Sequence, residues 1–201
     1  KAFYQSLSDA LIHAGKGKIV TFGIVPTYAN TGYGYIQAET NSDEYNSTVL
    51  NVKCFKEKPD KKLAEAYLLE NDKLRDNNLA LSWYWNSGMF VCQAKTLLDE
   101  SSIHSSEILS KVRSSVESAI YDLDFIRLEE KTFALSPSIS IDYALMEKSK
   151  NVIVVPMNAK WIDVGSWSNL YDIGKKDTSN NFIKGDVVSL ETTNSYINAS
   201  H

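Results

Sequence analysis

Four short motifs in this chain each join an extended apolar run to a sharp glycine or proline break. In chain order they are Thr31–Tyr35, Phe55–Pro59, Trp85–Phe90 and Trp161–Trp167. One such motif is ordinary turn chemistry. Four of them place carboxylate, ammonium and carboxamide groups beside chain breaks, and that combination could bind a sugar, a phosphate and a metal ion.

The first motif holds Gly32 and Gly34 on either side of Tyr33. Glycine lets the backbone approach a ligand closely, so a backbone amide here could contact a sugar hydroxyl. A plain tight turn at the start of a strand gives the same pattern, because glycine–x–glycine is a weak signal. The motif alone leaves both interpretations open.

The second motif places two charges at the end of an extended run. Pro59 ends that run, so Glu57 and Lys58 lie at the end of a strand, where α/β folds bind ligands. Adjacent strand residues point to opposite faces, so the two side chains cannot project alike unless the strand twists. One could meet a sugar hydroxyl while the other reaches a phosphate. A solvated ion pair is the alternative.

The third motif sets an amide, Asn86, before Ser87 and Gly88 in a strongly apolar surround. A buried amide without partners costs about 1–3 kcal/mol. Asn86 therefore needs either a ligand or a structural partner, such as neighbouring backbone.

Two aspartates complete the candidate set. Asp163 follows a strand and a loop and precedes a helix expected to start near Ser166, a position that suits a carboxylate holding a hard cation. An N-cap or turn aspartate is the alternative. Asp142 follows Ser140 at the start of a short helix predicted from Ile141 to about residue 148. Asp142 could cap that helix or face the pocket, and the cap is the favoured interpretation.

The composition is that of a globular protein. Of 201 residues, 43% are apolar and 23% charged, and the net charge is −4. The sequence contains no basic stripe of the kind that binds nucleic acid. No apolar stretch approaches the ~18 residues that suggest a membrane span. The two cysteines, Cys54 and Cys92, form no disulfide or zinc pattern, so partly buried, reduced thiols are expected.

Strands and helices alternate along the chain, which predicts an α/β sandwich with helices on both faces of a mixed sheet. Helices are expected at residues 3–14, in a stretch after Asp60, over most of 94–130 and at 166–173. Strands are expected at 18–25, 32–37, 49–55, part of 79–92 and 151–157. A hairpin loop is expected at 41–47. Residues 182–197 look like one or two exposed strands. We expect a domain boundary that separates residues 1–178 from a linker or β segment at 179–201, which leads to an unseen C-terminal domain.

Taken together, these stretches resemble the sugar-1-phosphate nucleotidylyltransferases, and most closely the mannose-1-phosphate guanylyltransferase (GDP-mannose pyrophosphorylase) family. The matching stretches keep the family's order and are Thr21–Pro26, Thr31–Ile36, Phe55–Pro59, Trp85–Phe90, Ser140–Ala144 and Asp163–Trp167. They span nearly the whole chain. The resemblance implies a Rossmann-like nucleotidyltransferase sandwich.

The resemblance also implies an activity: the intact protein would make GDP-mannose and pyrophosphate from GTP and mannose 1-phosphate, with Mg²⁺, as a cytoplasmic homo-oligomer. By matching motif, the substrate-binding residues would be Gly32, Tyr33, Gly34, Glu57, Lys58, Asn86, Ser87, Gly88 and Asp142. Lys58 would bind the sugar's phosphate. Asp163 would be one of two magnesium ligands and, with Lys58, a catalytic residue.

The chain departs from the family's pattern in one important respect. The family's glycine-rich loop G-x-G-T-R-x-x-P, the lysine after it and the second magnesium-binding aspartate do not occur among these residues. We therefore expect a fragment that holds the sugar side of the site and does not turn over alone. Asn169 also departs from the pattern, at a position that looks like surface.

Two other functions stay open. One is a catalytically inactive regulatory subunit that senses sugar nucleotides. The other is a bifunctional protein named for mannose-6-phosphate isomerase activity in a downstream cupin domain.

Overall fold

The computed structural model describes residues 2–39, 49–77, 82–159 and 161–200. The chain divides into two compact units, Lys1–Ala159 and Lys160–His201. The boundary predicted after residue 178 falls inside the second unit, and the further domain expected beyond it stays a prediction. The hairpin loop predicted at 41–47 lies outside the described residues.

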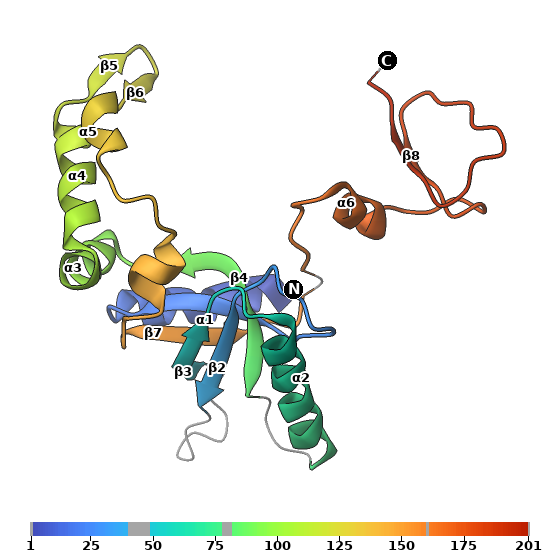
Figure 1. The fold of residues 1–201 in the computed structure, drawn as a ribbon, viewed down its shortest axis with the longest axis horizontal. Helices are drawn as coiled ribbons and strands as arrows, with labels where there is room; N and C mark the ends of the chain where they lie inside the picture. Colours follow the sequence, from blue (N-terminus) through green and yellow to red (C-terminus); the bar gives the residue numbers. More distant parts are fainter. Residues whose placement is uncertain (1, 40–48, 78–81, 160, 201) are drawn as a thin grey trace. The chain divides into compact units, whose positions relative to one another are not determined.

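The first unit is built on a five-stranded mixed sheet (Figure 1). Its strands are β1 (Ile19–Ile24), β2 (Tyr35–Glu39), β3 (Leu50–Lys56), β4 (Trp83–Val91) and β7 (Val152–Pro156). The order is β1-β4-β2-β3-β7, and the sheet closes because β3 also pairs with β7, with Leu50 opposite Val154. Among the strand pairs described in this sheet, only β1 and β7 run parallel. The expected mixed α/β fold is confirmed; closure of the sheet is a feature that the sequence did not indicate.

Strand β1 is buried along its whole length, as its run of β-branched residues predicts. Gly23 lets it pack closely on its neighbours. A methyl group at Gly23 would come within 2.8 Å of Val154 Cγ2 and 2.9 Å of Tyr84 Cβ. A side chain there would push β1 away from the neighbouring strands.

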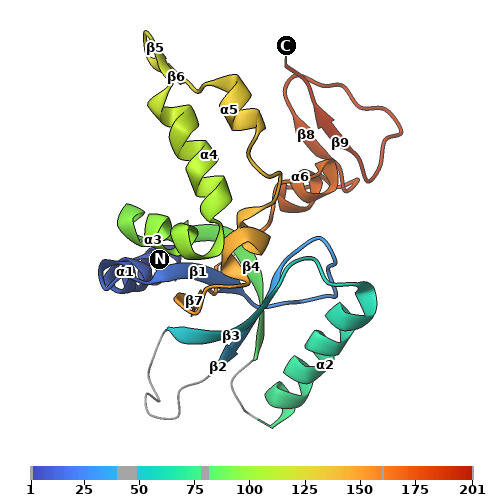
Figure 2. The same ribbon diagram turned by 60° about the vertical axis from the view of Figure 1, so that its left-hand side comes forward.

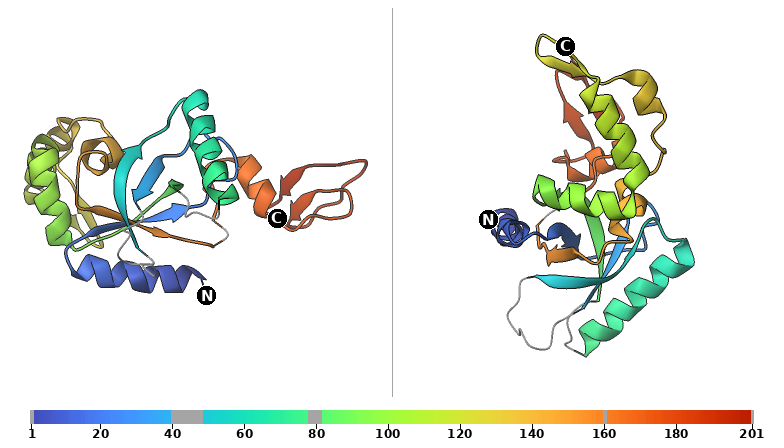
Figure 3. Two further views of the ribbon diagram at one scale, coloured as in Figure 1. Left: turned by 90° about the horizontal axis from the view of Figure 1, so that it is seen from below. Right: turned by 90° about the vertical axis from the view of Figure 1, so that its left-hand side faces the viewer.

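Six helical segments accompany the sheet: α1 (Ala2–Gly15), α2 (Lys61–Asp76), α3 (Ala94–His104), α4 (Ser106–Glu117), α5 (Glu130–Ala134) and the π-helical turn η1 (Asp142–Met146). Helix α1 lies along β1, and Figure 3 shows it below the sheet. Helix α2 begins as predicted, because the Asp60 carboxylate accepts a hydrogen bond from Leu63 N at 2.8 Å. Asn71 fixes α2 to β4, since its amide bonds to both the N–H and the C=O of Trp83.

The helical pattern expected from Ala94 to Glu130 is wrong over its last third. A hairpin of β5 (Ile120–Asp122) and β6 (Phe125–Arg127) follows α4 and extends from its end (Figure 2). Its turn passes through Leu123 at φ +53°, a left-handed conformation that leucine rarely adopts. The turn therefore carries none of the usual glycine or asparagine signals. Leu98 on α3 and Val116 on α4 are exposed.

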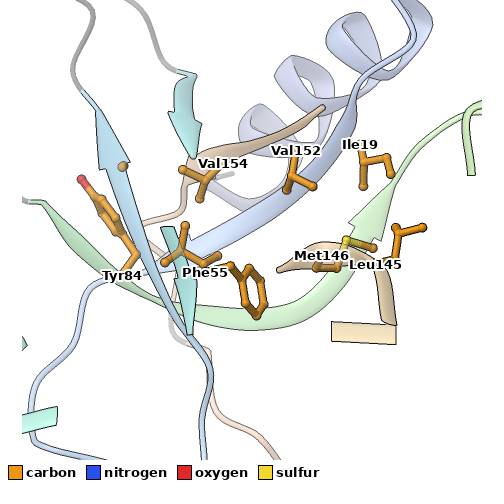
Figure 4. Close-up of a cluster of buried hydrophobic side chains, with 9 residues drawn as sticks. Ile19, Phe55, Tyr84, Leu145, Met146, Val152 and Val154 are labelled. Carbon is orange, nitrogen blue, oxygen red and sulfur yellow. The ribbon is translucent and has the colours of Figure 1, made fainter. Parts of the chain in front are cut away.

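The core of the first unit ties the site-bearing segments together. It consists of Ile19, Ile36, Ala38, Phe55, Tyr84, Leu145, Met146, Val152 and Val154. Figure 4 shows Phe55, near the end of β3, in the same cluster as Leu145 and Met146 from the π turn. Each such buried side chain contributes about 1.5–3 kcal/mol of transfer free energy. The same packing thus holds the end of β3 and the π turn in place.

The second unit contains α6 (Trp167–Ile173), β8 (Phe182–Lys184) and β9 (Tyr196–Asn198), and the two strands pair in parallel. The predicted helix end at Gly174 is confirmed. A methyl group at Gly174 would come within 2.1 Å of Phe182 Cδ1, so the close approach of β8 requires glycine here.

Two further sequence expectations concern the cysteines and the membrane. Cys54 and Cys92 are both free thiols; Cys92 is half-buried, whereas Cys54 is exposed, contrary to expectation. Across the described ranges, no helix is long and apolar enough to cross a membrane.

Candidate functional site

The candidate site begins where β2 and β3 lie side by side. Tyr35 pairs with Lys56, so Gly34 and Glu57 come next in register. A methyl group at Gly34 would come within 2.5 Å of Glu57 Oε2. The absence of a side chain at Gly34 is therefore what makes room for the Glu57 carboxylate, which is only 6% exposed.

Glu57 and Lys58 form an ion pair between adjacent residues. They do not point to opposite faces, because the strand has already ended at Lys56 and Lys58 adopts φ +44°. That left-handed conformation brings the ammonium back onto the Glu57 carboxylate. The hydrogen bond to Glu57 raises the pKa of Lys58, and the nearby carboxylates add to the effect. More than half of the Lys58 side chain remains exposed to solvent.

Asn86 is buried, and both ends of its amide are engaged. Its Oδ1 accepts hydrogen bonds from Thr21 Oγ1 at 2.8 Å and from Gly88 N at 3.3 Å. Its Nδ2 donates to Asp142 Oδ1 at 3.2 Å. The partners that the sequence required are thus a neighbouring backbone group and two side chains from distant elements.

The backbone around Asn86 explains how it reaches these partners. Thr21 lies opposite Phe90 and Gly23 lies opposite Asn86, so β4 carries extra residues between the two pairs. Gly88 lies in this bulge with φ +73°. The apolar segment is therefore interrupted at the predicted place, although β4 continues through it. Asn86 N also donates to Gly34 O at 2.8 Å, which joins the third motif to the first.

Asp142 opens the π turn and faces the site. The predicted helix after Ser140 forms with an i→i+5 hydrogen bond from Glu147 N to Asp142 O at 2.9 Å, the mark of a π turn. At its start, Ser140 Oγ accepts a hydrogen bond from Tyr143 N at 3.5 Å. The favoured cap interpretation is therefore wrong, since the Asp142 carboxylate reaches Asn86. Burial raises the pKa of Asp142 above its ordinary value, and the Glu57 carboxylate raises it further.

Of the remaining motif residues, Gly32 and Tyr33 lie on the loop before β2, and Ser87 lies in the bulge of β4. Gly32 N donates to Asn30 Oδ1 at 2.8 Å, which closes the turn before Gly34. The ring of Tyr33 packs edge-on against Trp85, with centroids 5.2 Å apart. Ser87 Oγ accepts a hydrogen bond from Met89 N at 3.3 Å. The first three motifs and the Ser140 motif thus meet in one part of the first unit.

Asp163 belongs to the second unit, and its role at this site stays a prediction. Its side chain is exposed on the loop before α6. It is not the N-cap, because Ser166 Oγ accepts the capping hydrogen bond from Asn169 N at 3.2 Å. Asn169 Nδ2 also donates to Asp163 O. Asn169, which looked like surface in the sequence, therefore fixes the Asp163 loop.

Three residues near the site were missed by sequence reasoning. Thr21 holds Asn86, while Tyr143 and Glu147 hydrogen-bond to the backbone of Glu57. For Thr21 a signal was present, since it is a polar residue in an otherwise apolar buried strand. Tyr143 and Glu147 are four residues apart, a spacing that places two side chains on one face of a helix.

The chain as a whole is similar to known proteins. Residues 1–180 match the protein family described as nucleotidyl transferase. Mannose-1-phosphate guanylyltransferase of Escherichia coli is 43% identical over 198 residues, which are 98% of this chain and 40% of that protein. The protein of the same name from Sinorhizobium fredii is 41% identical over 195 residues, 97% of this chain and 36% of that protein. The chain thus spans about two fifths of the length of the curated relatives it matches.

Two solved structures are also similar. One, from Thermus thermophilus, is described as mannose-1-phosphate geranyltransferase; it has a TM-score of 0.71 and 26% identity, and the match covers 99% of this chain and 55% of that one. The other, from Helicobacter pylori, is described as mannose-6-phosphate isomerase; it has a TM-score of 0.67 and 34% identity, and the match covers 81% and 58% of the two chains.

Proposed function

The chain belongs to the nucleotidyl transferase family, and on that premise we propose that the intact protein is a mannose-1-phosphate guanylyltransferase. An oxygen of the mannose 1-phosphate phosphate group attacks the α-phosphorus of GTP, the bond to the β-phosphate oxygen breaks, and pyrophosphate leaves with GDP-mannose as the product. Such a transfer asks little covalent chemistry of the protein, so positioning and charge stabilisation dominate.

The observation that carries this proposal is the close meeting of Gly34, Glu57, Lys58 and Asn86 in one cluster. The carboxylate of Glu57, which lies against the bare α-carbon of Gly34, can accept hydrogen bonds from sugar hydroxyls. The exposed Lys58 ammonium is within a side-chain rotation of the same place and can pair with a phosphate. The supporting names are those of relatives more than 40% identical to this chain.

The proposal includes Mg²⁺, and Asp163 is the ligand that this chain offers. Its carboxylate oxygens are the hard donors that Mg²⁺ takes, and few protein ligands suffice because Mg²⁺ keeps several waters. Within the described ranges no group of three or more His, Cys, Asp or Glu side chains could hold a metal. When bound, the ion would neutralise charge on the phosphates. The cytoplasmic, homo-oligomeric state belongs to the same proposal.

The decisive experiment measures pyrophosphate release by the intact protein. We expect release from GTP only when mannose 1-phosphate is added, with GDP-mannose formed in equal amount. Glucose 1-phosphate is the matched control for the sugar, and dTTP is the control for the base. Tight binding of GDP-mannose with no turnover under any of these conditions would instead support the regulatory subunit.

A second activity is favoured by one comparison, because the similar Helicobacter pylori structure is described as a mannose-6-phosphate isomerase. In the intact protein this activity would belong to residues outside the two units described here. Conversion of mannose 6-phosphate to fructose 6-phosphate, assayed without GTP, tests it independently of pyrophosphate release.

A further inference from the structure

Glu57 lies just beyond the hydrogen-bonded ladder of the sheet. The pairing of β3 with β2 ends at Lys56, opposite Tyr35. The left-handed turn at Lys58 follows directly. A left-handed conformation is unfavourable for lysine, so neighbouring groups must hold the backbone in place.

The side chains that hold it come from the π turn. Glu57 N donates to Glu147 Oε1 at 3.0 Å, and Glu57 O accepts from Tyr143 Oη at 3.3 Å. Both backbone groups of Glu57 are therefore engaged by one turn of helix, more than 80 residues away in the chain. Asp142, in the same turn, accepts a hydrogen bond from Asn86.

The packing of the π turn supplies the fixed support. Ala144, Leu145 and Met146 are buried in the core, whereas Tyr143 and Glu147 lie on the exposed side. The turn is thus anchored by its apolar residues, and its polar residues are free to hold Glu57. Because Tyr143 and Glu147 are not core residues, replacing either is not expected to unfold the protein.

We propose that Tyr143 and Glu147 are positioning residues that hold the Glu57 backbone and so direct the Glu57 carboxylate and the Lys58 ammonium toward a sugar phosphate. The sugar-phosphate part of this statement rests on the proposed function. The holding of the Glu57–Lys58 pair does not, and it can be measured without substrate.

The test uses Tyr143→Phe, Glu147→Ala and Glu147→Gln in the intact protein. The glutamine variant keeps an oxygen that can accept from Glu57 N, so it serves as the conservative rescue. Tyr121→Phe and Glu107→Ala, at exposed sites on β5 and α4, are the matched controls. Two quantities are measured: steady-state kinetics, and the rate at which an acetyl-N-hydroxysuccinimide ester acetylates Lys58, followed by peptide mass spectrometry.

We expect Tyr143→Phe and Glu147→Ala to raise the KM for mannose 1-phosphate about 3- to 10-fold, the loss typical of one hydrogen bond, and to leave the KM for GTP within about twofold. Glu147→Gln should stay within about twofold of wild type in both. Lys58 should be acetylated faster in the first two variants, because an ammonium released from Glu57 loses its proton more readily.

Unchanged Lys58 acetylation in both variants, or an equal change in the controls, would overturn the positioning role. If the wild-type protein makes no GDP-mannose, the proposed function fails, and the acetylation rates still decide the positioning. If acetylation rises while the KM for mannose 1-phosphate does not, the pair is held as proposed but does not bind the sugar phosphate, and the proposal as stated is wrong.

Discussion

The carboxylate of Glu57 lies against the bare α-carbon of Gly34, at a distance that leaves no room for a methyl group. The two residues follow the paired positions of β2 and β3, so the register of the sheet sets their contact. The Glu57 carboxylate of the second motif thus explains why the first motif has glycine at position 34. This contact also gives a direct way to displace Glu57 without changing its chemistry.

Gly34→Ala should impair sugar-phosphate binding with only a modest loss of stability. The new methyl group would meet Glu57 Oε2, the far end of a side chain that can turn away. We expect the KM for mannose 1-phosphate to rise about 10-fold or more, in line with loss of a charged hydrogen bond. Gly15→Ala is the control, because a methyl group there meets nothing within 4 Å. Equal kinetics in the two variants would contradict the placement of Glu57 in the sugar site.

Removal of the Lys58 ammonium should weaken binding of the sugar's phosphate. A charged hydrogen bond contributes about 1.5–3 kcal/mol, so the KM for mannose 1-phosphate should rise about 10- to 100-fold. Lys58→Gly is compared with Lys58→Ala, since only glycine adopts φ +44° without strain. Loss of the charge predicts the same KM in both variants, and the glycine variant should be the more stable of the two because it relieves the strain at φ +44°. Lys61→Ala, an exposed lysine on α2, should match wild type.

Thr21 should affect binding through Asn86. Thr21→Val removes the hydroxyl that donates to Asn86 Oδ1 and keeps the volume, whereas Thr21→Ser keeps the hydroxyl and removes a methyl group. Each should lower the free energy of unfolding by about 1 kcal/mol, the first through an unmet hydrogen bond and the second through lost burial. Only Thr21→Val should raise the KM for mannose 1-phosphate. A matching rise in Thr21→Ser would show that Thr21 acts through packing.

The fold was predictable wherever local signals agree with tertiary packing. The Asp60 cap, the buried run at 19–24 and Gly174 each carry a turn, cap or period signal, and each lies where the sequence places it. The β5–β6 hairpin was missed because its turn uses Leu123 in a glycine-like conformation. Closure of the sheet depends on the pairing of β3 with β7, which joins residues about 100 positions apart in the chain and leaves no local signal.

The site residues show the same division. Glu57, Lys58 and Asn86 could be found because each is a polar group at a chain break. Their partners could not, since the contact of Tyr143 with Glu57 depends on how the core seats the π turn. The expectation of opposite faces for Glu57 and Lys58 failed for a local reason: the strand ends one residue before Glu57.

Asp142 should make stability depend on pH. Its pKa is raised above the ordinary value of 3.8, chiefly by burial and then by Glu57. The folded protein therefore holds this proton more tightly than the unfolded chain, so the ionised carboxylate opposes folding. This loss of stability sets in as the pH rises from the ordinary pKa through the raised one.

Asp142→Asn removes that charge and keeps an oxygen that can accept from Asn86 Nδ2. The urea midpoint of the variant should exceed that of wild type at pH 7, and the two should converge near pH 3, where Asp142 is protonated in both states. Asp76→Asn, at an exposed site on α2, is the control. A difference that persists unchanged at low pH would show that its cause is not the ionisation of Asp142.

Asp163 should govern the dependence of turnover on Mg²⁺. The loop that carries it is held by Asn169, whose side-chain Nδ2 donates a hydrogen bond to Asp163 O. The backbone N–H of Asn169 donates to Ser166 Oγ. This arrangement leaves the Asp163 carboxylate exposed, where it can reach a hydrated cation. Asn169→Ala should therefore raise the Mg²⁺ concentration needed for half-maximal rate, without removing the ligand itself.

Asp163→Asn should lower turnover by about 100-fold or more, because a phosphate-bound cation supplies several kcal/mol of charge stabilisation. Binding of mannose 1-phosphate measured by calorimetry in EDTA should be unchanged, since that contact is assigned to Lys58 and Glu57. Asp172→Asn removes an exposed carboxylate on α6 and should match wild type. This control distinguishes loss of a metal ligand from a general effect of surface charge. If Asp163→Asn kept the turnover of wild type and the same dependence on Mg²⁺ concentration, Asp163 would not be a ligand of the metal. Because the sugar-phosphate measurement is independent of the metal, that result would leave the assignments of Glu57 and Lys58 standing.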